Sequence, residues 1–282
     1  GIVPEHVFGQ VPFDQWRTHD WSKISIGSGP FLVSSWRPGE EIVLVRNDRY
    51  VDPDRPLLEK VAVRIVPDIG NLETQLAAGA IVSDVGSVKG SVVRDMAPQL
   101  PKGTHFIPAH PVAGTEYSGP DAGFAELFVN RWCILTPPDG ADQKATDKLA
   151  AFWRLLGANV ETMEPDHHDL VLAITSHLPH LIAYTIVGTA DELQTVTRSE
   201  VLKFSAGGFR DFTRIAASDP TMWRDVFLAN KDAVLEMLGR FNEDVSALTK
   251  AIRKGDGDAL FEHFVRTRAI RKGIVDIGQD SL

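Results

Sequence analysis

The first 79 residues alternate short apolar runs with turn-forming residues, a pattern that predicts strands joined by loops. The mostly apolar run 42–46 and the alternating run 61–66 predict two strands, and Phe31 is expected to begin another. Asn, Asp and Pro residues predict a loop over residues 47–56. Residues 68–78 are expected to form a short helix, which Asp68 caps and Gly79 ends.

After residue 80 the pattern changes, first to mixed strands and helices and then to helices alone. Apolar runs predict strands over residues 81–85, 105–107 and 132–136. Residues 142–156 predict an amphipathic helix with four large apolar side chains on one face. These are Leu149, Phe152, Trp153 and Leu156. From Pro165 onward almost the whole pattern is helical.

A long helix is predicted over residues 230–254, with apolar residues at alternating spacings of four and three. They are Val234, Leu238, Phe241, Val245, Leu248 and Ile252. This heptad-like seam suits either burial inside one helix bundle or burial between two chains. The pattern alone leaves both alternatives open.

Composition narrows the possible functions. The 282 residues carry a net charge of -9 and a pI of about 5.5, which argues against a non-specific nucleic-acid binder. The single cysteine, Cys133, excludes a disulfide framework and a cysteine-based metal cluster, and its apolar surroundings predict a buried, inert thiol. We expect no membrane span, since no run approaches the roughly 18 apolar residues required. The sequence begins at Gly1 and shows no signal peptide.

Five ordered motifs in residues 1–79 resemble the mid-chain segment of extracellular solute-binding proteins of the oligopeptide and dipeptide class. They are Val3-Pro4-Glu5-His6, Ile26-Gly27-Ser28-Gly29-Pro30-Phe31, Trp36-Arg37-Pro38-Gly39-Glu40, Arg46-Asn47-Asp48-Arg49-Tyr50 and Val63-Arg64-Ile65-Val66-Pro67-Asp68. In that family the peptide lies between two lobes far larger than this segment. We therefore expect a partial layer of strands and loops without a ligand site.

The Gly27-x-Gly29 turn does not match a dinucleotide-binding loop. The Gly-x-Gly-x-x-Gly fingerprint requires glycine at position 32, where this chain has Leu32. Pro30 further removes a backbone donor that a phosphate would need. The turn is therefore not predicted to bind a cofactor.

Several polar residues after residue 80 stand where an active site could form. Ser87 follows a predicted strand, the position where open α/β sheets bind ligands, and His110 follows another. An imidazole there can accept the proton of a substrate hydroxyl, and Ser87 can orient it. His177 and His180 share one helical face, but no cysteine or carboxylate stands at zinc spacing, so no metal site is predicted.

Four ordered motifs in residues 80–282 closely resemble prephenate dehydrogenases, a family that includes arogenate and cyclohexadienyl dehydrogenases. They are Ser83-Asp84-Val85-Gly86-Ser87-Val88-Lys89, His110-Pro111-Val112-Ala113-Gly114-Thr115-Glu116, Ser176-His177-Leu178-Pro179-His180 and Gly207-Gly208-Phe209-Arg210-Asp211-Phe212-Thr213-Arg214. In that family NAD(P)+ takes hydride from the ring carbinol of prephenate while the ring carboxylate leaves as carbon dioxide.

The resemblance implies roles for particular residues. His110 and Ser87 would be catalytic, and Arg214 would bind a substrate carboxylate with its planar fork. His177 and His180 would shape the substrate pocket, and Glu116 and Trp223 match pocket positions without a specific chemistry. The resemblance also implies prephenate or arogenate as substrate, NAD or NADP as cofactor, a homodimer formed through the helical part, and a cytoplasmic location. The family of the first segment is extracytoplasmic.

The chain departs from that family where the cofactor should bind. A Gly-x-Gly-x-x-Gly loop is expected before the Ser83-Asp84 strand, but the transporter-like segment stands there, leaving only Asp84, Gly86 and Ser87 as remnants. We therefore predict an α+β mosaic: a solute-binding-protein-like fragment (1–79), a truncated Rossmann-like remnant (80–164) and an all-helical dehydrogenase domain (165–282). It is expected to be inactive alone. The alternatives are an active dehydrogenase with a rebuilt cofactor site and a non-enzymatic binding or dimerisation module.

Overall fold

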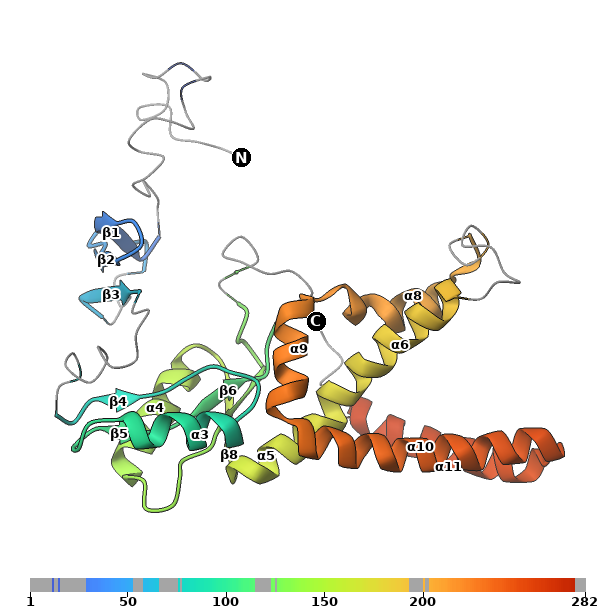
Figure 1. Cartoon of the computed structure of the whole chain (residues 1–282). Helices are drawn as coiled ribbons and strands as arrows, with labels where there is room; N and C mark the ends of the chain where they lie inside the picture. The colour runs from blue at the N-terminus through green and yellow to red at the C-terminus, as the bar shows by residue number, and fades with distance from the viewer. Residues whose placement is uncertain are drawn as a thin grey trace. The chain divides into compact units, whose positions relative to one another are not determined.

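The computed structural model separates the chain into two compact units, Gly1–Leu76 and Ala77–Leu282. It describes residues 29–52, 58–65, 78–114, 126–192 and 203–276, together with positions 12, 15, 76, 123–124 and 200. The predicted helix over 68–78 and the motif at Val3 to His6 lie almost wholly or wholly outside the described residues. The two units are drawn in Figure 1 and are considered separately below.

The first unit contains one antiparallel sheet in the order β1-β2-β3. Its strands are β1 (Phe31–Arg37), β2 (Glu41–Arg46) and β3 (Lys60–Arg64), which confirms the strands expected from the sequence. Among the described residues of this unit, only Asn47 is buried. Its side-chain amide donates to the carbonyl of Gly29 at 2.8 Å. This bond joins the residue after β2 to the segment before β1. The described part of this unit is thus a thin layer.

The second unit begins with an α/β part that is made of short strands. Strand β4 (Ile81–Val82) pairs in parallel with β5 (His105–Phe106), and α3 (Gly90–Met96) and η3 (Ala97–Gln99) lie between them in sequence. Strand β7 (Trp132–Leu135) pairs with β6 (Ala109–Pro111) antiparallel and with β8 (Asn159–Thr162) in parallel. The strand predicted over 81–85 is shorter than expected, since β4 ends at Val82. Beyond its end, the Asp84 carboxylate accepts the Ala109 amide of β6 at 3.1 Å.

Helix α4 (Gln143–Leu155) covers this sheet and supplies much of its core. Asp142 caps it by accepting the Ala145 amide at 2.8 Å, and the helix confirms the one expected over residues 142–156. Trp153 is buried against Leu135 and Cys133, but Phe152 and Leu156 are exposed, so the predicted apolar face was only partly correct. Burial raises the pKa of the Cys133 thiol to about 12, which confirms the expectation of an inert cysteine.

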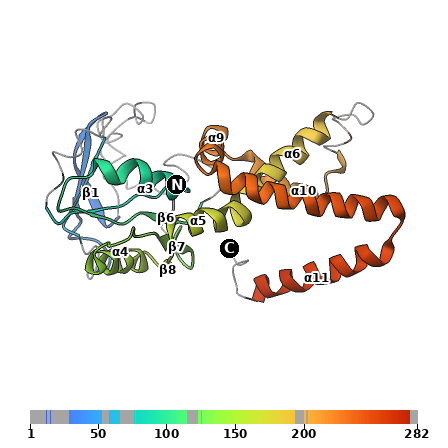
Figure 2. The same ribbon diagram turned by 60° about the horizontal axis from the view of Figure 1, so that its bottom comes forward.

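The remainder of the second unit is helical (Figures 1 and 2). In chain order its elements are α5 (Pro165–Leu172), the π-helical turn η5 (Ala173–His177), α6 (Leu178–Glu192), α8 (Gly207–Thr213), η6 (Arg214–Ala217), α9 (Pro220–Ala229), α10 (Lys231–Lys254) and α11 (Gly257–Asp276). Val234 and Met237 of α10 pack against Ala173 and Leu178, forming the core of the helical part.

The two halves of the heptad-like seam of α10 differ in burial. Its first half packs inside the chain, since Val234 is buried and Leu238 and Phe241 lie against the same core. Its second half is open, with Val245 and Ile252 exposed at 41% and 65%. Burial within one bundle therefore accounts for the first half only.

One helical run, Pro165–Glu192, is long and apolar enough to cross a membrane by length and composition, contrary to our reading of the sequence. The same run carries His168, Asp169 and His177, which are all buried in contact with other elements of the unit. These contacts are those of a core helix in a folded domain.

Leu135 lies at the centre of the α/β core and is fully buried. We expect Leu135→Ala to lower the free energy of unfolding by about 3 kcal/mol, because it removes buried methyl groups and leaves a cavity. The matched control is Leu155→Ala, whose side chain is half exposed and whose loss should cost less than about 1 kcal/mol. Urea unfolding followed by circular dichroism measures both, and equal costs would contradict this account of the core.

Candidate active site

A cavity of about 340 Å³ lies between the α/β part and the helices of the second unit. Its lining consists of Ser87, His110, Val112, Ala113, Gly114, Ser176, His180, Arg214, Ile215, Ser218, Met222 and Trp223. Five residues that the sequence singled out thus meet in one place, although they come from distant parts of the chain. The cavity has the size of a small-molecule site and contains both apolar and charged walls.

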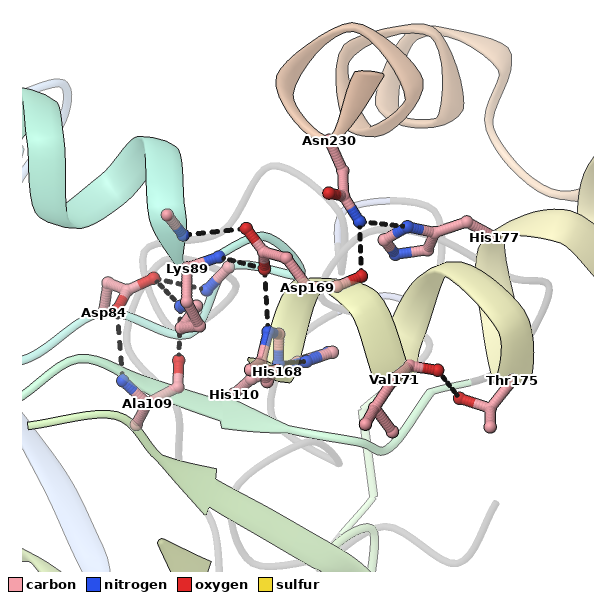
Figure 3. A network of polar contacts seen from close by, with 12 residues as sticks. Asp84, Lys89, Ala109, His110, His168, Asp169, Val171, Thr175, His177 and Asn230 are labelled. Carbon is pink, nitrogen blue, oxygen red and sulfur yellow. Dashed lines mark hydrogen bonds and ion pairs between the residues drawn. The ribbon is translucent and has the colours of Figure 1, made fainter. Parts of the chain in front are cut away.

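His110 enters this cavity from β6, where the register with Ile134 of β7 sets its position. The imidazole is 7% exposed, and its Nδ1 lies 2.8 Å from Nε2 of His168 (Figure 3). Burial, the largest cause, lowers the pKa of His110 to about 3, and the charge of Lys89 acts in the same direction. His110 is therefore a neutral imidazole at pH 7.

The residue behind His110 is His168 of α5, which is fully buried. Its Nδ1 lies 2.8 Å from Oδ1 of Asp169, and the Asp169 oxygens also accept the backbone amides of Lys89 and Gly90, each at 2.8 Å. Burial alone would raise the pKa of Asp169, but the hydrogen bonds from His168 and the two amides outweigh it and lower the pKa. Asp169 is thus an ionised carboxylate inside the protein.

A second buried ion pair holds the Ser87 loop against β6. Lys89 is fully buried, and its Nζ bonds the carboxylate of Asp84 and, at 2.7 Å, the carbonyl of Ala109. Asp84 also accepts the amides of Ala109 at 3.1 Å and Gly86 at 2.8 Å. Because Ala109 precedes His110, this pair places Ser87 and His110 beside the same cavity.

The opposite wall comes from the helices. The ring of His180 stacks on Trp223 with centroids 3.6 Å apart, and His180 Nδ1 donates to the Ser176 carbonyl at 2.8 Å. Pro179, the second residue of α6, has no backbone N–H to donate, and the π-helical turn η5 ends two residues before it. Burial lowers the pKa of His180, and the charge of Arg214 acts in the same direction.

His177 lies behind this wall and is absent from the cavity lining. It is 1% exposed, and its Nδ1 accepts the side-chain amide of Asn230 at 3.0 Å. The same amide donates to the Asp169 carbonyl at 2.8 Å, so Asn230 ties α10 to α5. Burial lowers the pKa of His177 to about 4. The sequence placed His177 and His180 on one face, but only His180 reaches the cavity.

The outcome for the remaining predicted residues is mixed. Ser87, Arg214 and Trp223 line the cavity, whereas Glu116 lies outside the described residues. In the described part of the chain, the bond that orients the His110 ring comes from His168, and Ser87 stands in the cavity wall. Among the described residues, no three His, Cys, Asp or Glu side chains are grouped closely enough to hold a metal ion.

Four residues of this network were missed as site residues by sequence reasoning: His168, Asp169, Lys89 and Asn230. The available signal was the His168-Asp169 pair inside an apolar helix, where a charged side chain requires a buried partner. Lys89 ends the Ser83–Lys89 motif, which by itself indicates no role for it. Asn230 offers no comparable signal, because it is a common type of residue at a helix start.

Two family models match most of the second unit. Residues 63–162 match the model "Prephenate dehydrogenase, nucleotide-binding domain", and residues 164–266 match "Prephenate dehydrogenase, dimerization domain". The nucleotide-binding match begins at residue 63. The sequence pattern instead predicted that the dehydrogenase-like part begins at residue 80. The nucleotide-binding match therefore reaches into the segment that resembles solute-binding proteins.

Individual relatives agree with these matches. The chain is 45% identical to cyclohexadienyl dehydrogenase of Zymomonas mobilis over 197 residues, covering 70% of this chain and 67% of that protein. It is similar to the crystal structure of prephenate dehydrogenase from A. aeolicus in complex with hydroxyphenyl propionate and NAD+, with a TM-score of 0.67 and 37% identity, covering 73% and 71% of the two chains. The chain spans between 52% and 67% of the length of three curated dehydrogenases that it matches.

A shorter match concerns a different class of protein. Oligopeptide-binding protein AppA of Bacillus subtilis is 38% identical over 81 residues, which cover 28% of this chain and 15% of that protein.

Asp84→Asn tests the buried pair. It leaves the Lys89 ammonium without its counter-ion, so we expect the free energy of unfolding to fall by about 3 kcal/mol or more. The matched control is Asp95→Asn, which breaks an exposed pair with Arg94 and should change stability by less than about 1 kcal/mol. Urea unfolding provides both values, and an unchanged stability in Asp84→Asn would contradict the proposed coupling of the Ser87 loop to β6.

The buried histidines predict a dependence of stability on pH. The pKa of His110 is about 3 in the folded chain and about 6.5 when unfolded, so the unfolded state binds more protons between these values. The contribution of neutral His110 to the free energy of unfolding is therefore fully present above about pH 6.5. Between about pH 6.5 and pH 3 it falls by about 1.4 kcal/mol for each unit by which the pH decreases. Urea unfolding between pH 7 and pH 4.5 measures the slope, and His110→Asn should reduce it by that amount. An unchanged slope would contradict a neutral buried His110.

Proposed function

Because the chain belongs to the prephenate dehydrogenase family, we propose that residues 80–282 bind prephenate or arogenate in the cavity between β6 and the helices. The observation that carries this proposal is the meeting of a neutral, buried His110 and an arginine, Arg214, in one cavity of about 340 Å³. A substrate with a hydroxyl at one end and a carboxylate at the other matches these two groups.

In this proposal the residues that line the cavity bind the substrate and accept its proton. The Arg214 guanidinium binds a substrate carboxylate, since its planar fork suits two parallel hydrogen bonds. His110 accepts the proton of the ring hydroxyl at the nitrogen that faces the cavity. His180 and Trp223, which stack on one another, form a rigid wall beside the substrate ring. Ser87 and Glu116 keep the catalytic and pocket roles that the resemblance implies.

The family implies NAD or NADP as the hydride acceptor, but the residues of this chain do not fit a dinucleotide. The Gly-x-Gly-x-x-Gly sequence does not occur in the 282 residues. The Lys89 and Gly90 amides at the start of α3 already bond Asp169 and are not free for a phosphate. These 282 residues by themselves therefore bind NAD(P)+ too weakly for turnover.

The same proposal includes the mosaic organisation. Residues 1–79 are a fragment of the solute-binding type without a peptide site, residues 80–164 are a nucleotide-binding remnant and residues 165–282 are the helical domain. The 81-residue similarity to AppA supports the first assignment. The thin sheet of the first unit, with little buried among its described residues, is consistent with a fragment.

A second function is homodimerisation through the helical domain. The matched model for residues 164–266 is described as a dimerization domain, and large apolar side chains of α10 and α11 are exposed. They include Val245, Ile252, Phe261, Phe264 and Val265. Leu238, which the sequence suggested as part of the dimer seam, packs in the core of its own chain instead.

Substrate binding can be tested without the cofactor. We expect isothermal titration with 3-(4-hydroxyphenyl)propionate to show binding, and Arg214→Gln to weaken it by about 10-fold or more, because a charge-assisted pair is lost. The matched control is Arg210→Gln, which removes an exposed guanidinium paired with Asp211 and should leave binding unchanged. Equal affinity in wild type and Arg214→Gln would overturn the assignment of Arg214.

The cofactor proposal is tested by prephenate-dependent NADH formation and by NAD+ titration. We expect neither turnover nor micromolar NAD+ binding in a sample that circular dichroism shows to be folded. His110→Asn controls for contaminating enzyme. Turnover that disappears in His110→Asn would instead establish an active dehydrogenase with a rebuilt cofactor site.

A further inference from the structure

Three buried side chains form a continuous line from the cavity into the interior of the second unit (Figure 3). Nδ1 of His110 lies 2.8 Å from Nε2 of His168, and Nδ1 of His168 lies 2.8 Å from Oδ1 of Asp169. The exposed fractions are 7% for His110, 0% for His168 and 7% for Asp169, so water does not replace these contacts. The first member of the line is in the cavity wall and the last is held by α3.

The positions of the protons along this line follow from its inner end. An ionised Asp169 can only accept hydrogen bonds, so Nδ1 of His168 must carry a proton. In a neutral His168, Nε2 then has a lone pair and must accept from Nδ1–H of His110. The remaining nitrogen of His110, Nε2, consequently has a lone pair and no proton.

The carboxylate at the inner end cannot turn away from His168. One oxygen accepts the Lys89 amide and the other the Gly90 amide, and a Cβ at position 90 would stand 3.0 Å from the second oxygen. The carbonyl of Asp169 itself accepts the Asn230 side chain. Three elements (α3, α5 and α10) therefore fix the carboxylate that begins the line.

We propose that His168 and Asp169 are positioning residues that fix His110 in its Nδ1–H form, so that Nε2 is the nitrogen that takes the substrate proton. The inference rests on the proposed function and deepens it. In the step concerned, the O–H bond of the substrate hydroxyl breaks, its electron pair stays on oxygen, and the proton forms a bond with Nε2 of His110.

The same line stabilises the imidazolium that this step creates. His110 then carries a positive charge, and its Nδ1–H donates more strongly to His168, whose own proton is held by the Asp169 carboxylate. Lys89 and His177 face the same region, and any positive charge on them opposes the new charge. The charge of the Asp169 carboxylate acts in the opposite direction and favours protonation of His110.

The test reads the histidine tautomers directly, in the full chain and without substrate or cofactor. Long-range ¹H–¹⁵N correlation spectra of the ¹⁵N-histidine-labelled protein at pH 7 distinguish protonated from unprotonated ring nitrogens, and His110→Asn and His168→Phe assign the signals. We expect His110 and His168 both to carry their proton on Nδ1. In His168→Phe, the His110 proton should move to Nε2, because Nδ1 has lost its acceptor.

The matched control is His167→Phe, which changes the adjacent, exposed histidine and should leave the His110 signals unchanged. A proton on Nε2 of His110 in the wild-type chain overturns the inference, and so does a His110 tautomer that is the same in wild type and His168→Phe. If His168→Phe does not fold, the wild-type spectrum alone decides. Failure to bind 3-(4-hydroxyphenyl)propionate would refute the proposed function while leaving the tautomers as a separate result.

Discussion

The arrangement of the second unit depends first on the buried carboxylate of Asp169. Burying an ion costs several kcal/mol unless donors replace the lost water. Here the donors are two backbone amides at the start of α3 and the ring of His168. Because those donors belong to different segments, satisfying the charge requires α3 and α5 to meet in one arrangement. The arrangement of the cavity follows from that requirement.

The Asp84–Lys89 pair extends the same constraint to the sheet. The Lys89 backbone bonds Asp169, and the Lys89 side chain bonds Asp84 and the Ala109 carbonyl. One residue therefore connects the helical part, the loop after β4 and strand β6. The two carboxylates together bring Ser87, His110 and the helical wall to one cavity, although no regular sheet joins β4 with β6.

The use of the α3 amides also bears on what this unit can bind. A helix start with free amides is a common anion site, but here an internal carboxylate occupies it. The same contact that orients His110 through His168 thus occupies both of these amides. In our proposal the unit is equipped for the substrate and poorly equipped for the cofactor, because the 282 residues lack the Gly-x-Gly-x-x-Gly sequence.

The sequence alone determined the local elements and the chemistry of the individual residues. The helix over residues 142–156, the strands around Ile42 and Cys133, and the long helix α10 follow from periodicity, which acts over a few residues. Ordered motifs also identified Ser87, His110, His180, Arg214 and Trp223, which the structure places around one cavity. Tertiary structure decided that His180 faces the cavity while His177 lies behind it, and that half of the α10 seam is buried. It also decided that Asp169, through His168, orients His110. These outcomes depend on contacts between residues far apart in the chain, such as the hydrogen bond between Lys89 and Asp169, and no local pattern encodes which distant partner a buried charge will find.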